Sequence, residues 1–473
     1  MEGLVKKGIS LNTHQMVSAT GGILLKDGGQ TCLGVSIDTR TLEPGALYFA
    51  LQGERFDGHS FVKEAVDKGA HGVVIQTDRF YSMGEWLSQI RGFVIGVNDT
   101  LRGLQDLASA HRRQFDLPLV AVTGSNGKST TKELIASILQ GRWHVLKNVG
   151  NLNNHIGVPL TLLKLDPSHQ AAVSEMGISG RGELTRLCEM AQPELGVITN
   201  IGPAHLQALG SLEGVAQAKG ELLEALKSGS LFAHNLNDPY ITGLVMKTRG
   251  IKIISFGLDR VADVSGQAMG FDPQRGEIFR LKTREGEVSV SLPLFGHHHI
   301  LNALAASAVA IGLGFSLDEI KRGLEGFSGM KMRMEVHPTP AGIWVINDAY
   351  NANPDSMKYA LETLVRLKGP GRGIAVLGDM LELGAESEDL HLQLGRATGR
   401  QGLDFLFTVG EQGRLLAKGA VEGGMDSDKV WALDHGVEVT THLSGLLRAG
   451  DWVLVKGSRK MRLEEIVEEL LKK

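Results

Sequence analysis

The chain of 473 residues has few cysteines, no long apolar run and no excess of either charge. Its two cysteines, Cys32 and Cys188, lie far apart and outside any CxxC pattern, which argues against a disulfide framework or a cysteine metal site and fits a reducing compartment. The 49 Lys and Arg against 53 Asp and Glu leave a net charge of −4, so no cationic field favours nucleic acid or an anionic membrane. Local loops would have to bind any anionic ligand.

Residues 1–22 contain no apolar core of a signal peptide. The most apolar stretch, residues 300–315, is too short to span a bilayer and contains Asn302 and Ser307. We therefore expect a cytoplasmic protein without membrane insertion and without a nucleic-acid partner. No heptad or exposed apolar stripe is evident, so a monomer is expected.

The length suggests about three domains of roughly 150 residues each. Short apolar runs typical of buried strands occur at residues 34–37, 72–75, 93–97, 119–123, 171–174, 195–199, 343–346, 373–377, 403–409 and 452–455. Helical spacing of apolar residues occurs at 101–115, 132–139, 301–306, 317–324 and 463–471. This alternation predicts an α/β protein whose sheets are mainly parallel and doubly wound.

The strongest motif is Thr-Gly-Ser-Asn-Gly-Lys-Ser-Thr at residues 123–130, between a predicted strand and a predicted helix. A tight glycine turn there would present backbone N–H groups to a phosphate at the positive end of the helix. Lys128 would meet the outer phosphates and the Ser129 hydroxyl would bind Mg²⁺. The motif is not a full Walker A, because Val122 stands where the first glycine is required. The alternative is a glycine turn with a solvated lysine.

Single polar residues follow later strands. Glu175 ends the strand at 171–174, and His205 follows the strand at 195–199. The carboxyl ends of parallel strands face the ligand crevice, so both are candidate Mg²⁺ ligands beside the phosphate loop. Each could equally be an ordinary turn or loop residue. For Lys219, in an amphipathic stretch, the pattern alone favours a solvated helix lysine.

Three further segments are weaker signals. Residues 148–154 contain four asparagines, which form either an ordinary polar loop or one that orients a substrate. The triplet His297-His298-His299 resembles a metal tract, but adjacent side chains point in different directions, which argues against joint metal binding. Residues 36–40 and 53–59 combine Arg, Ser and Thr with glycines and could bind a second phosphate-bearing ligand.

Taken together, these segments resemble the Mur ligase family of ATP-dependent amide-forming enzymes, in order and over essentially the whole chain. The matching segments are residues 36–40, 53–59, 123–129, 151–161, 175–177, 200–205, 218–221, 302–304, 347–356 and 377–384. The resemblance implies a smaller N-terminal α/β domain for the UDP moiety (1–117), a central P-loop parallel-sheet ATPase domain (118–328) and a C-terminal Rossmann-like domain for a dipeptide (329–473).

The resemblance further implies a ligase that joins D-alanyl-D-alanine to the tripeptide carboxylate of UDP-N-acetylmuramoyl-tripeptide through an acyl phosphate, with ATP and two Mg²⁺. Catalysis would depend on Lys128, His205 and Lys219, the last carbamylated. Residues implied to bind ATP are Thr123, Gly124, Ser125, Asn126, Gly127, Lys128, Ser129, Thr130, Asn302, Arg333 and Asp348, with Asn302 at the adenine. The implied metal ligands are Ser129, Glu175, His205 and Lys219.

The resemblance also implies the acceptor sites. The UDP-linked substrate would contact Ser36, Asp38, Thr39, Arg40, Gly53, Arg55, Asp57, His59, Asn151, Asn153 and Asn154. The dipeptide would contact Tyr350, Asn351, Asn353, Ser356, Asp379 and Leu381. Closure between domains should protect the acyl phosphate from water, with hinges near residues 117–118 and 328–329.

This sequence departs from the family pattern at two places. Relatives usually show Gly-Arg-His-Asn where this chain has Gly296-His297-His298-His299, so the adenine side is altered. Tripeptide-adding relatives often show Asn-Pro-Arg, whereas Asn353-Pro354-Asp355 favours dipeptide addition. A folylpolyglutamate-synthase-like ligase is the alternative, but it would not need the segment 36–59. A non-enzymatic phosphate-loop binding module would not need Glu175 beside the phosphate. A structural or scaffolding role fits the sequence least.

Overall fold

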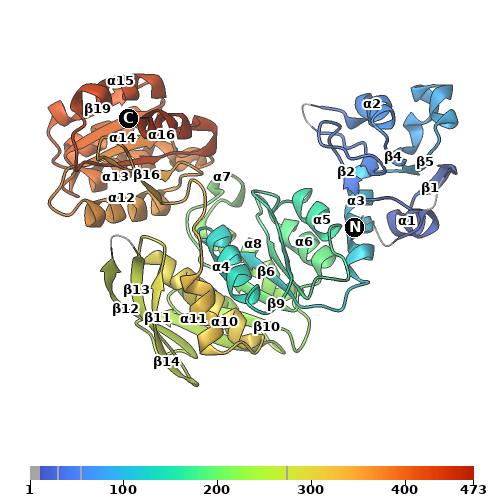
Figure 1. The fold of residues 1–473 in the computed structure, drawn as a ribbon, viewed down its shortest axis with the longest axis horizontal. Helices are drawn as coiled ribbons and strands as arrows, with labels where there is room; N and C mark the ends of the chain where they lie inside the picture. The colour runs from blue at the N-terminus through green and yellow to red at the C-terminus, as the bar shows by residue number, and fades with distance from the viewer. Residues whose placement is uncertain (1–10, 29–30, 54–55, 273–274, 473) are drawn as a thin grey trace.

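The computed structural model describes residues 11–28, 31–53, 56–272 and 275–472 (Figure 1). Three sheets follow one another along the chain, each covered by helices, and the first and third lie on opposite sides of the central part. The predicted class, three α/β domains, is therefore confirmed. Among the described residues, no helix combines the length and the apolar character needed to cross a membrane.

The first sheet has five strands in the order β1-β5-β4-β3-β2, parallel except for β1 against β5. Its elements are α1 (Thr13–Thr20), β1 (Ile23–Lys26), β2 (Val35–Ser36), β3 (Leu47–Phe49), α2 (Val62–Asp67), β4 (Gly72–Gln76), β5 (Phe93–Val97) and α3 (Thr100–Arg112). The Asp99 side chain accepts hydrogen bonds from the first N–H groups of α3 and so begins that helix. The three predicted strands in this region are confirmed as β2, β4 and β5.

The central sheet has nine strands in the order β14-β13-β12-β11-β10-β9-β6-β8-β7. Its strands are β6 (Leu119–Thr123), β7 (Val145–Lys147), β8 (Ala171–Glu175), β9 (Leu195–Ile198), β10 (Leu231–Asn235), β11 (Lys252–Leu258), β12 (Val264–Asp272), β13 (Gly276–Thr283) and β14 (Gly286–Leu292). Its helices are α4 (Lys128–Leu139), α5 (Gly157–Leu162), α6 (Glu183–Ala191), α7 (Leu206–Leu209), α8 (Leu212–Ala225), α9 (Pro239–Val245), α10 (His298–Gly312) and α11 (Leu317–Glu325).

Strand β6 lies between β9 and β8 and is buried along its whole length, as its apolar sequence predicts. Strands β12, β13 and β14 pair antiparallel and extend the parallel sheet, which was not predicted. In this extension Phe279 and Leu281 are buried, while Arg280 between them is exposed. A strand with one solvated face alternates in this way and gives no continuous apolar run.

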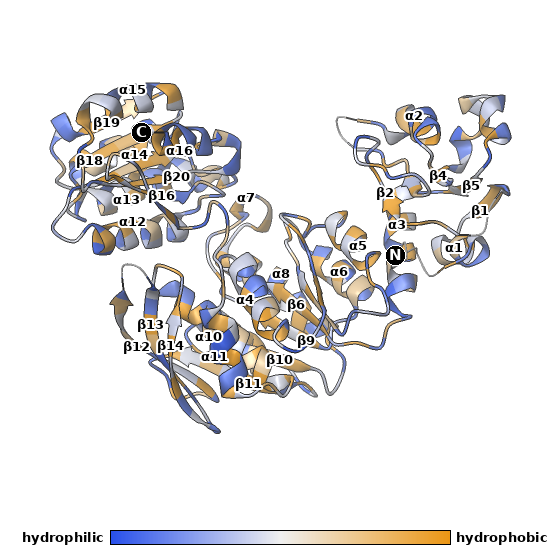
Figure 2. Ribbon diagram, in the orientation of Figure 1, coloured by the Kyte–Doolittle hydropathy of each residue, from blue (hydrophilic) through white to orange (hydrophobic). Residues whose placement is uncertain are grey.

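The third sheet has six strands in the order β15-β16-β20-β17-β18-β19, parallel except for β15 against β16. Strands in the middle of this sheet are hydrophobic (Figure 2). The six strands are β15 (Glu335–Pro338), β16 (Trp344–Asp348), β17 (Gly373–Gly378), β18 (Phe405–Val409), β19 (Val430–Leu433) and β20 (Trp452–Lys456). Its helices are α12 (Pro354–Lys368), α13 (Ser387–Gly399), α14 (Gly413–Glu422), α15 (Gly436–Leu446) and α16 (Glu464–Leu471).

Helix α3 lies between the first part of the chain and the central part (Figure 1) and contacts α5 and α6. Its Leu104 and Leu107 belong to the same buried cluster as Leu162 of α5 and Leu187 of α6. Arg112, at the end of α3, is 4% exposed and donates to the Ala191 carbonyl. The two parts therefore share one core.

Candidate functional site

The phosphate loop is the turn between β6 and α4, and two of its glycines are required by close packing. Gly124 has φ 145°, and a Cβ there would lie 1.9 Å from Thr199 Oγ1. Gly127 has φ 77°, and a Cβ there would lie 2.3 Å from Asn302 Oδ1. Helix α4 begins at Lys128, directly after this turn, rather than at residue 132 as predicted. The loop thus presents a helix N-terminus suited to bind phosphate.

The side chains of the loop are held by neighbouring strand ends. Ser125 Oγ donates to the Gly202 carbonyl at 2.9 Å, Thr123 Oγ1 donates to the Met176 carbonyl at 2.8 Å, and Asn126 N–H donates to Asn200 Oδ1 at 2.9 Å. Thr130, also predicted to bind ATP, is buried in α4. These contacts make the loop preorganised.

Lys128 folds back over the loop, where its Nζ donates to the Gly124 carbonyl at 2.7 Å and the Ser125 carbonyl at 3.2 Å. Burial lowers the pKa of Lys128; the Glu175 carboxylate opposes this shift and the Arg333 guanidinium adds to it. The ammonium is therefore placed at the loop itself, as the motif predicts.

Glu175 lies at the end of β8, beside the phosphate loop, and its side chain is 3% exposed. Its Oε1 accepts a 2.8 Å hydrogen bond from Asn153 Nδ2. Its Oε2 is buried without a hydrogen-bond partner among the described residues and lies 3.9 Å from Lys132 Nζ. An orphaned carboxylate oxygen at the strand end beside the phosphate loop fits a divalent cation, because Mg²⁺ is commonly held by one or two carboxylates plus substrate phosphates and water.

The described residues contain no group of three His, Cys, Asp or Glu side chains arranged for a metal. His297, His298 and His299 accordingly do not form such a group. The His298 ring instead stacks on Tyr359 of α12, with centroids 4.8 Å apart. His299 approaches Asn302 at 3.3 Å, which places Asn302 at the loop beside Gly127.

Lys219, on α8, is 2% exposed, so the solvated lysine that the pattern favoured is wrong. The side chain points inward because its neighbours on α8, Ala218 and Leu222, pack into the core. Burial lowers the pKa of Lys219 well below its ordinary value, and the positive charge of Lys128 adds to the shift. No other described residue forms a hydrogen bond or ion pair with its amine.

His205 directly precedes α7 as its N-cap residue and has a left-handed backbone, φ 55°. Its Nδ1 lies 3.0 Å from the carboxylate of Glu382, which comes from the third part of the chain and is itself left-handed at φ 66°. Burial lowers the pKa of His205, against the opposing charge of Glu382. Two strained residues from different domains therefore meet at this site.

The third part also contributes polar side chains to the phosphate loop. Arg333 Nη2 donates to Ser129 Oγ at 3.0 Å, and the guanidinium lies 4.1 Å from the centre of the Tyr350 ring. Asn353 Nδ2 donates to Asn126 Oδ1 at 2.6 Å. These contacts join the two domains directly at the predicted nucleotide site.

Asp348 is paired within its own domain, with Lys456 Nζ at 2.6 Å. Burial raises its pKa, and Lys456 opposes the shift. The adjacent strands β16, β20 and β17 end at one edge of the sheet, which also carries the residues predicted to bind the dipeptide. These residues are Tyr350, Asn351, Asn353, Ser356, Asp379 and Leu381. Asp379 is partly satisfied there by the Gly413 N–H, at 2.8 Å.

Most residues predicted to hold the UDP moiety bond to their own neighbours. Asp38 binds the exposed Arg40 guanidinium at 2.6 Å, which lowers the pKa of Asp38 to about 2. Asp57 pairs with the buried His59, whose Nε2 accepts the Gln76 N–H. The other described members near them are Ser36, Thr39 and Gly53. Arg55 lies outside the described residues.

The asparagines of residues 148–154 have different bonding partners. Asn153 bonds to Glu175 and therefore lies at the phosphate site. Asn154 Oδ1 accepts the Gly157 N–H at the start of α5, and Asn151 is exposed. Asn148, the first asparagine of the segment, bonds to the Glu175 backbone in both directions. Lys132 was missed, as were the contact of Asn148 with Glu175 and that of Glu382 with His205.

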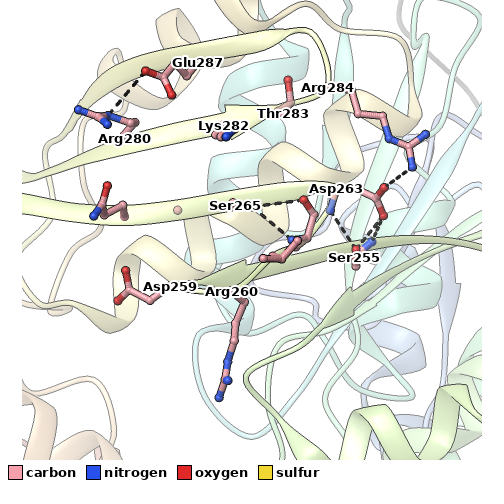
Figure 3. Close-up of a pocket in the computed structure, with 14 residues that line it drawn as sticks. Ser255, Asp259, Arg260, Asp263, Ser265, Arg280, Lys282, Thr283, Arg284 and Glu287 are labelled. Atoms are coloured by element: carbon pink, nitrogen blue, oxygen red, sulfur yellow. Dashed lines mark hydrogen bonds and ion pairs between the residues drawn. The ribbon is translucent and has the colours of Figure 1, made fainter.

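A groove of about 940 Å³ lies apart from these residues, over β11 to β14 (Figure 3). Most of its lining is charged or polar, and four of its charged residues form two local pairs. Arg284 binds Asp263 at 2.8 Å, and Arg280 approaches Glu287 at 4.0 Å. None of the predicted site residues lines it.

The fold and site define a class: a three-domain α/β protein with a phosphate loop between its central and third domains. Comparison with known families matches the Mur ligase family, catalytic domain, to residues 32–112, the Mur ligase middle domain to 122–310 and the Mur ligase, glutamate ligase domain, to 332–459. The chain belongs to the Mur ligase family.

Individual relatives match over most of their length. The UDP-N-acetylmuramoyl-tripeptide--D-alanyl-D-alanine ligase of Bacillus subtilis (strain 168) is 37% identical, covering 93% of each chain. A crystal structure of MurF from Acinetobacter baumannii superposes with a TM-score of 0.88 at 33% identity, covering 98% of this chain and 99% of that one. MurF ligase from Thermotoga maritima in complex with ADP gives a TM-score of 0.80 at 26% identity, covering 93% and 97%.

Proposed function

We propose that this chain is an ATP-dependent ligase that joins D-alanyl-D-alanine to UDP-N-acetylmuramoyl-tripeptide, giving the pentapeptide precursor of peptidoglycan. The observation that carries the proposal is the match of all three domains, in order, to ligases of this name, around a preorganised phosphate loop. A folylpolyglutamate-synthase-like activity is less favoured, because the segment 36–59 folds into an additional domain that the family comparison also matches.

In the first step, the tripeptide carboxylate attacks the γ-phosphoryl group of ATP, giving an acyl phosphate and ADP. The nucleophile and the phosphates are all anionic, so positioning and charge neutralisation carry the catalysis. The backbone N–H groups at the start of α4 would hold the phosphates, and Lys128 would turn from the loop carbonyls to the transferring group. Arg333 would add a second positive charge from the third domain.

We propose that Mg²⁺ is held at two places, by Ser129 with Glu175 and by His205 with Lys219. When bound, the cations would neutralise phosphate charge. Glu175 supports the first place because Oε2 is buried and unbonded within the described chain. Lys219 supports a carbamate: its buried amine has a lowered pKa, and a neutral amine adds CO₂, forming the N–C bond and losing one proton. The product is a carboxylate suited to a metal.

In the second step, the amine of D-alanyl-D-alanine attacks the acyl phosphate carbonyl, and the tetrahedral intermediate collapses to the amide and phosphate. The edge formed by Tyr350, Asn351 and Asp379 would orient the dipeptide, beside the loop that Asn353 contacts. Contacts between the third domain and the loop would keep water from the acyl phosphate. We further propose a cytoplasmic monomer with domain boundaries after residues 117 and 328.

The test is phosphate release from ATP and Mg²⁺ with UDP-N-acetylmuramoyl-tripeptide, with and without D-alanyl-D-alanine. We expect release that needs both acceptors and a product whose mass equals their sum less water. A Lys128→Ala variant that folds normally should be inactive. Release only with folate and glutamate would instead assign the chain to the alternative activity, and a fully active Lys128→Ala variant would remove the phosphate loop from the mechanism.

A further inference from the structure

Lys132 is a buried cation one helical turn beyond Lys128, and no role has been given to it above. It is 1% exposed and lies on α4, with its Nζ among three oxygens. It donates to the Asn148 carbonyl at 2.8 Å, binds Glu133 Oε1 at 3.0 Å and lies 3.9 Å from Glu175 Oε2. A buried charge is costly, so its retention here needs an explanation.

Asn148 connects Lys132 to Glu175. Its Oδ1 accepts the Glu175 N–H at 2.7 Å, and its Nδ2 donates to the Glu175 carbonyl at 3.1 Å and to the Leu152 carbonyl at 2.7 Å. The side chain of Asn148 therefore replaces a strand partner at the end of β8. Lys132 fixes the backbone of Asn148, and Asn148 fixes the backbone of Glu175.

The carboxylate of Glu175 is oriented by the same loop. Asn153 occupies Oε1, so Oε2 is the oxygen left without a hydrogen bond among the described residues. Lys132 is too far from Oε2 for a hydrogen bond but close enough to offset its negative charge. The two oxygens are thus kept different: one is bonded to protein and one is available.

We propose that Lys132 is a positioning residue for this enzyme: through Asn148 it holds Glu175 so that Oε2 faces a divalent cation at the phosphate loop. The proposal rests on the proposed function, since it concerns the metal of the ATP site. Lys132 touches neither ATP nor the reacting carboxylate. Its loss removes a charge that repels the cation but also frees Glu175 from its position, and we expect the second effect to dominate, so that cation binding weakens while the nucleotide stays bound.

The chain offers a matched control. The side chain of Lys147, the residue before Asn148, binds the other oxygen of Glu133 but makes no hydrogen bond to Asn148 or Glu175 among the described contacts. Lys132→Met and Lys147→Met each remove one ammonium from Glu133 while keeping an unbranched side chain. Only the first removes the support of Asn148. Lys132→Arg, which retains a charge and donors, provides a variant that should recover part of the effect.

The experiment measures Mn²⁺ binding to the full-length ADP complex by electron paramagnetic resonance, and ADP binding in EDTA by calorimetry. For Lys132→Met we expect a Mn²⁺ Kd raised about 10-fold or more, since residues behind a metal ligand typically change metal affinity by 10–100-fold. ADP affinity in EDTA should stay within about 2-fold, Lys132→Arg should recover part of the Mn²⁺ affinity, and Lys147→Met should match the wild type.

Wild-type Mn²⁺ affinity in Lys132→Met would overturn the proposal. So would an equal loss of ADP affinity in EDTA, which would show only a structural role. If Lys132→Met does not fold, the comparison passes to Lys132→Arg, whose Mn²⁺ Kd must rise while its ADP affinity holds. Failure of the proposed function is separate: the wild-type chain would then bind ADP and Mn²⁺ yet release no phosphate with the two acceptors.

Discussion

The central domain meets its two neighbours at an apolar seam on one side and, on the other, at a more polar seam where Phe271 and Phe295 also pack against the third domain. On one side, α3 shares a continuous apolar core with α5 and α6. On the other side, the contacts of the third domain at the phosphate loop are polar: Arg333 to Ser129, Asn353 to Asn126 and Glu382 to His205. Glu277 of β13, which is fully buried, also binds Arg366 of α12 at 2.8 Å.

The difference indicates where the molecule can move. Separating the apolar seam would expose Leu104 and Leu107 to water, at roughly 1.5–3 kcal/mol for each side chain. Polar contacts can exchange for water at a net loss of about 1 kcal/mol each. We therefore expect domain motion at residues 328–329 and little at 117–118, where the Arg112 guanidinium also binds the Leu117 carbonyl at 3.1 Å.

The largest effect should come from Arg112→Met, which tests the apolar seam that α3 forms with α5 and α6. The change leaves the carbonyls of Ala191, Phe115 and Leu117 without their donor. At about 1–3 kcal/mol for each buried unsatisfied group, unfolding free energy in urea should fall by at least about 3 kcal/mol. Turnover of the folded enzyme should stay near wild type. Arg113, the next residue, is exposed, so Arg113→Met is the control. Equal losses of unfolding free energy in the two variants would contradict the comparison.

Arg333→Met tests the more polar seam and should lower activity while leaving stability nearly unchanged. Losing the contact with Ser129 removes a positive charge at the phosphate loop and one link that places the third domain. We expect kcat/KM for ATP to fall about 100-fold, the size typical of a misplaced reacting group, with little change in the urea midpoint. Lys331→Met, two residues earlier and exposed, should be neutral. A large loss of stability with normal kinetics would make this seam structural.

Glu382→Gln is a second test of the more polar seam, because Glu382 belongs to the third domain and contacts His205 of the central domain. Its carboxylate would accept the Nδ1–H of His205 and so leave Nε2 for the site. The amide accepts more weakly, so we expect kcat to fall about 10-fold while KM for UDP-N-acetylmuramoyl-tripeptide stays unchanged. Glu386→Gln, exposed nearby, serves as control. An unchanged kcat would mean that the ion pair is only a surface contact.

The smallest effect belongs to a surface pair away from both seams. The Arg40 guanidinium holds the pKa of Asp38 at about 2, below its unfolded value near 4. The stabilisation is therefore fully present above pH 4 and is lost as the pH falls toward 2. Arg40→Met should shift the urea midpoint only slightly at pH 7, and the gap from wild type should close below pH 4. A gap that widens on acidification would reverse the assigned sign.

Much of the fold could be predicted because buried parallel strands are continuous apolar runs. Strand β6 has the predicted bounds, and β17 and β20 each extend only one residue further. The extension β12 to β14 was missed because one face is solvated, so its apolar residues alternate with charged ones. Short strands such as β7, with three residues, carry too little pattern to be recognised.

The candidate site could be predicted where a motif fixes the backbone and not where tertiary packing decides. The glycines of the phosphate loop and the position of Glu175 follow from local sequence. The burial of Lys219 does not, because it depends on which face of α8 meets the core. The contact between His205 and Glu382 joins residues 177 positions apart that no local pattern connects.

Because of helix α3, the functional domain 1–117 and the cooperative folding unit do not end at the same residue. The helix belongs to the range 1–117, but its apolar face completes the core of the next domain. In hydrogen exchange, amides of α3 should open together with those of α5, α6 and the first sheet, because all of them contribute to one buried cluster. A truncated chain that begins at residue 118 would lose α3 and expose the apolar side of α5 and α6, and one that begins at residue 100 would lose the residues of the first sheet that pack in the same cluster, so both should aggregate.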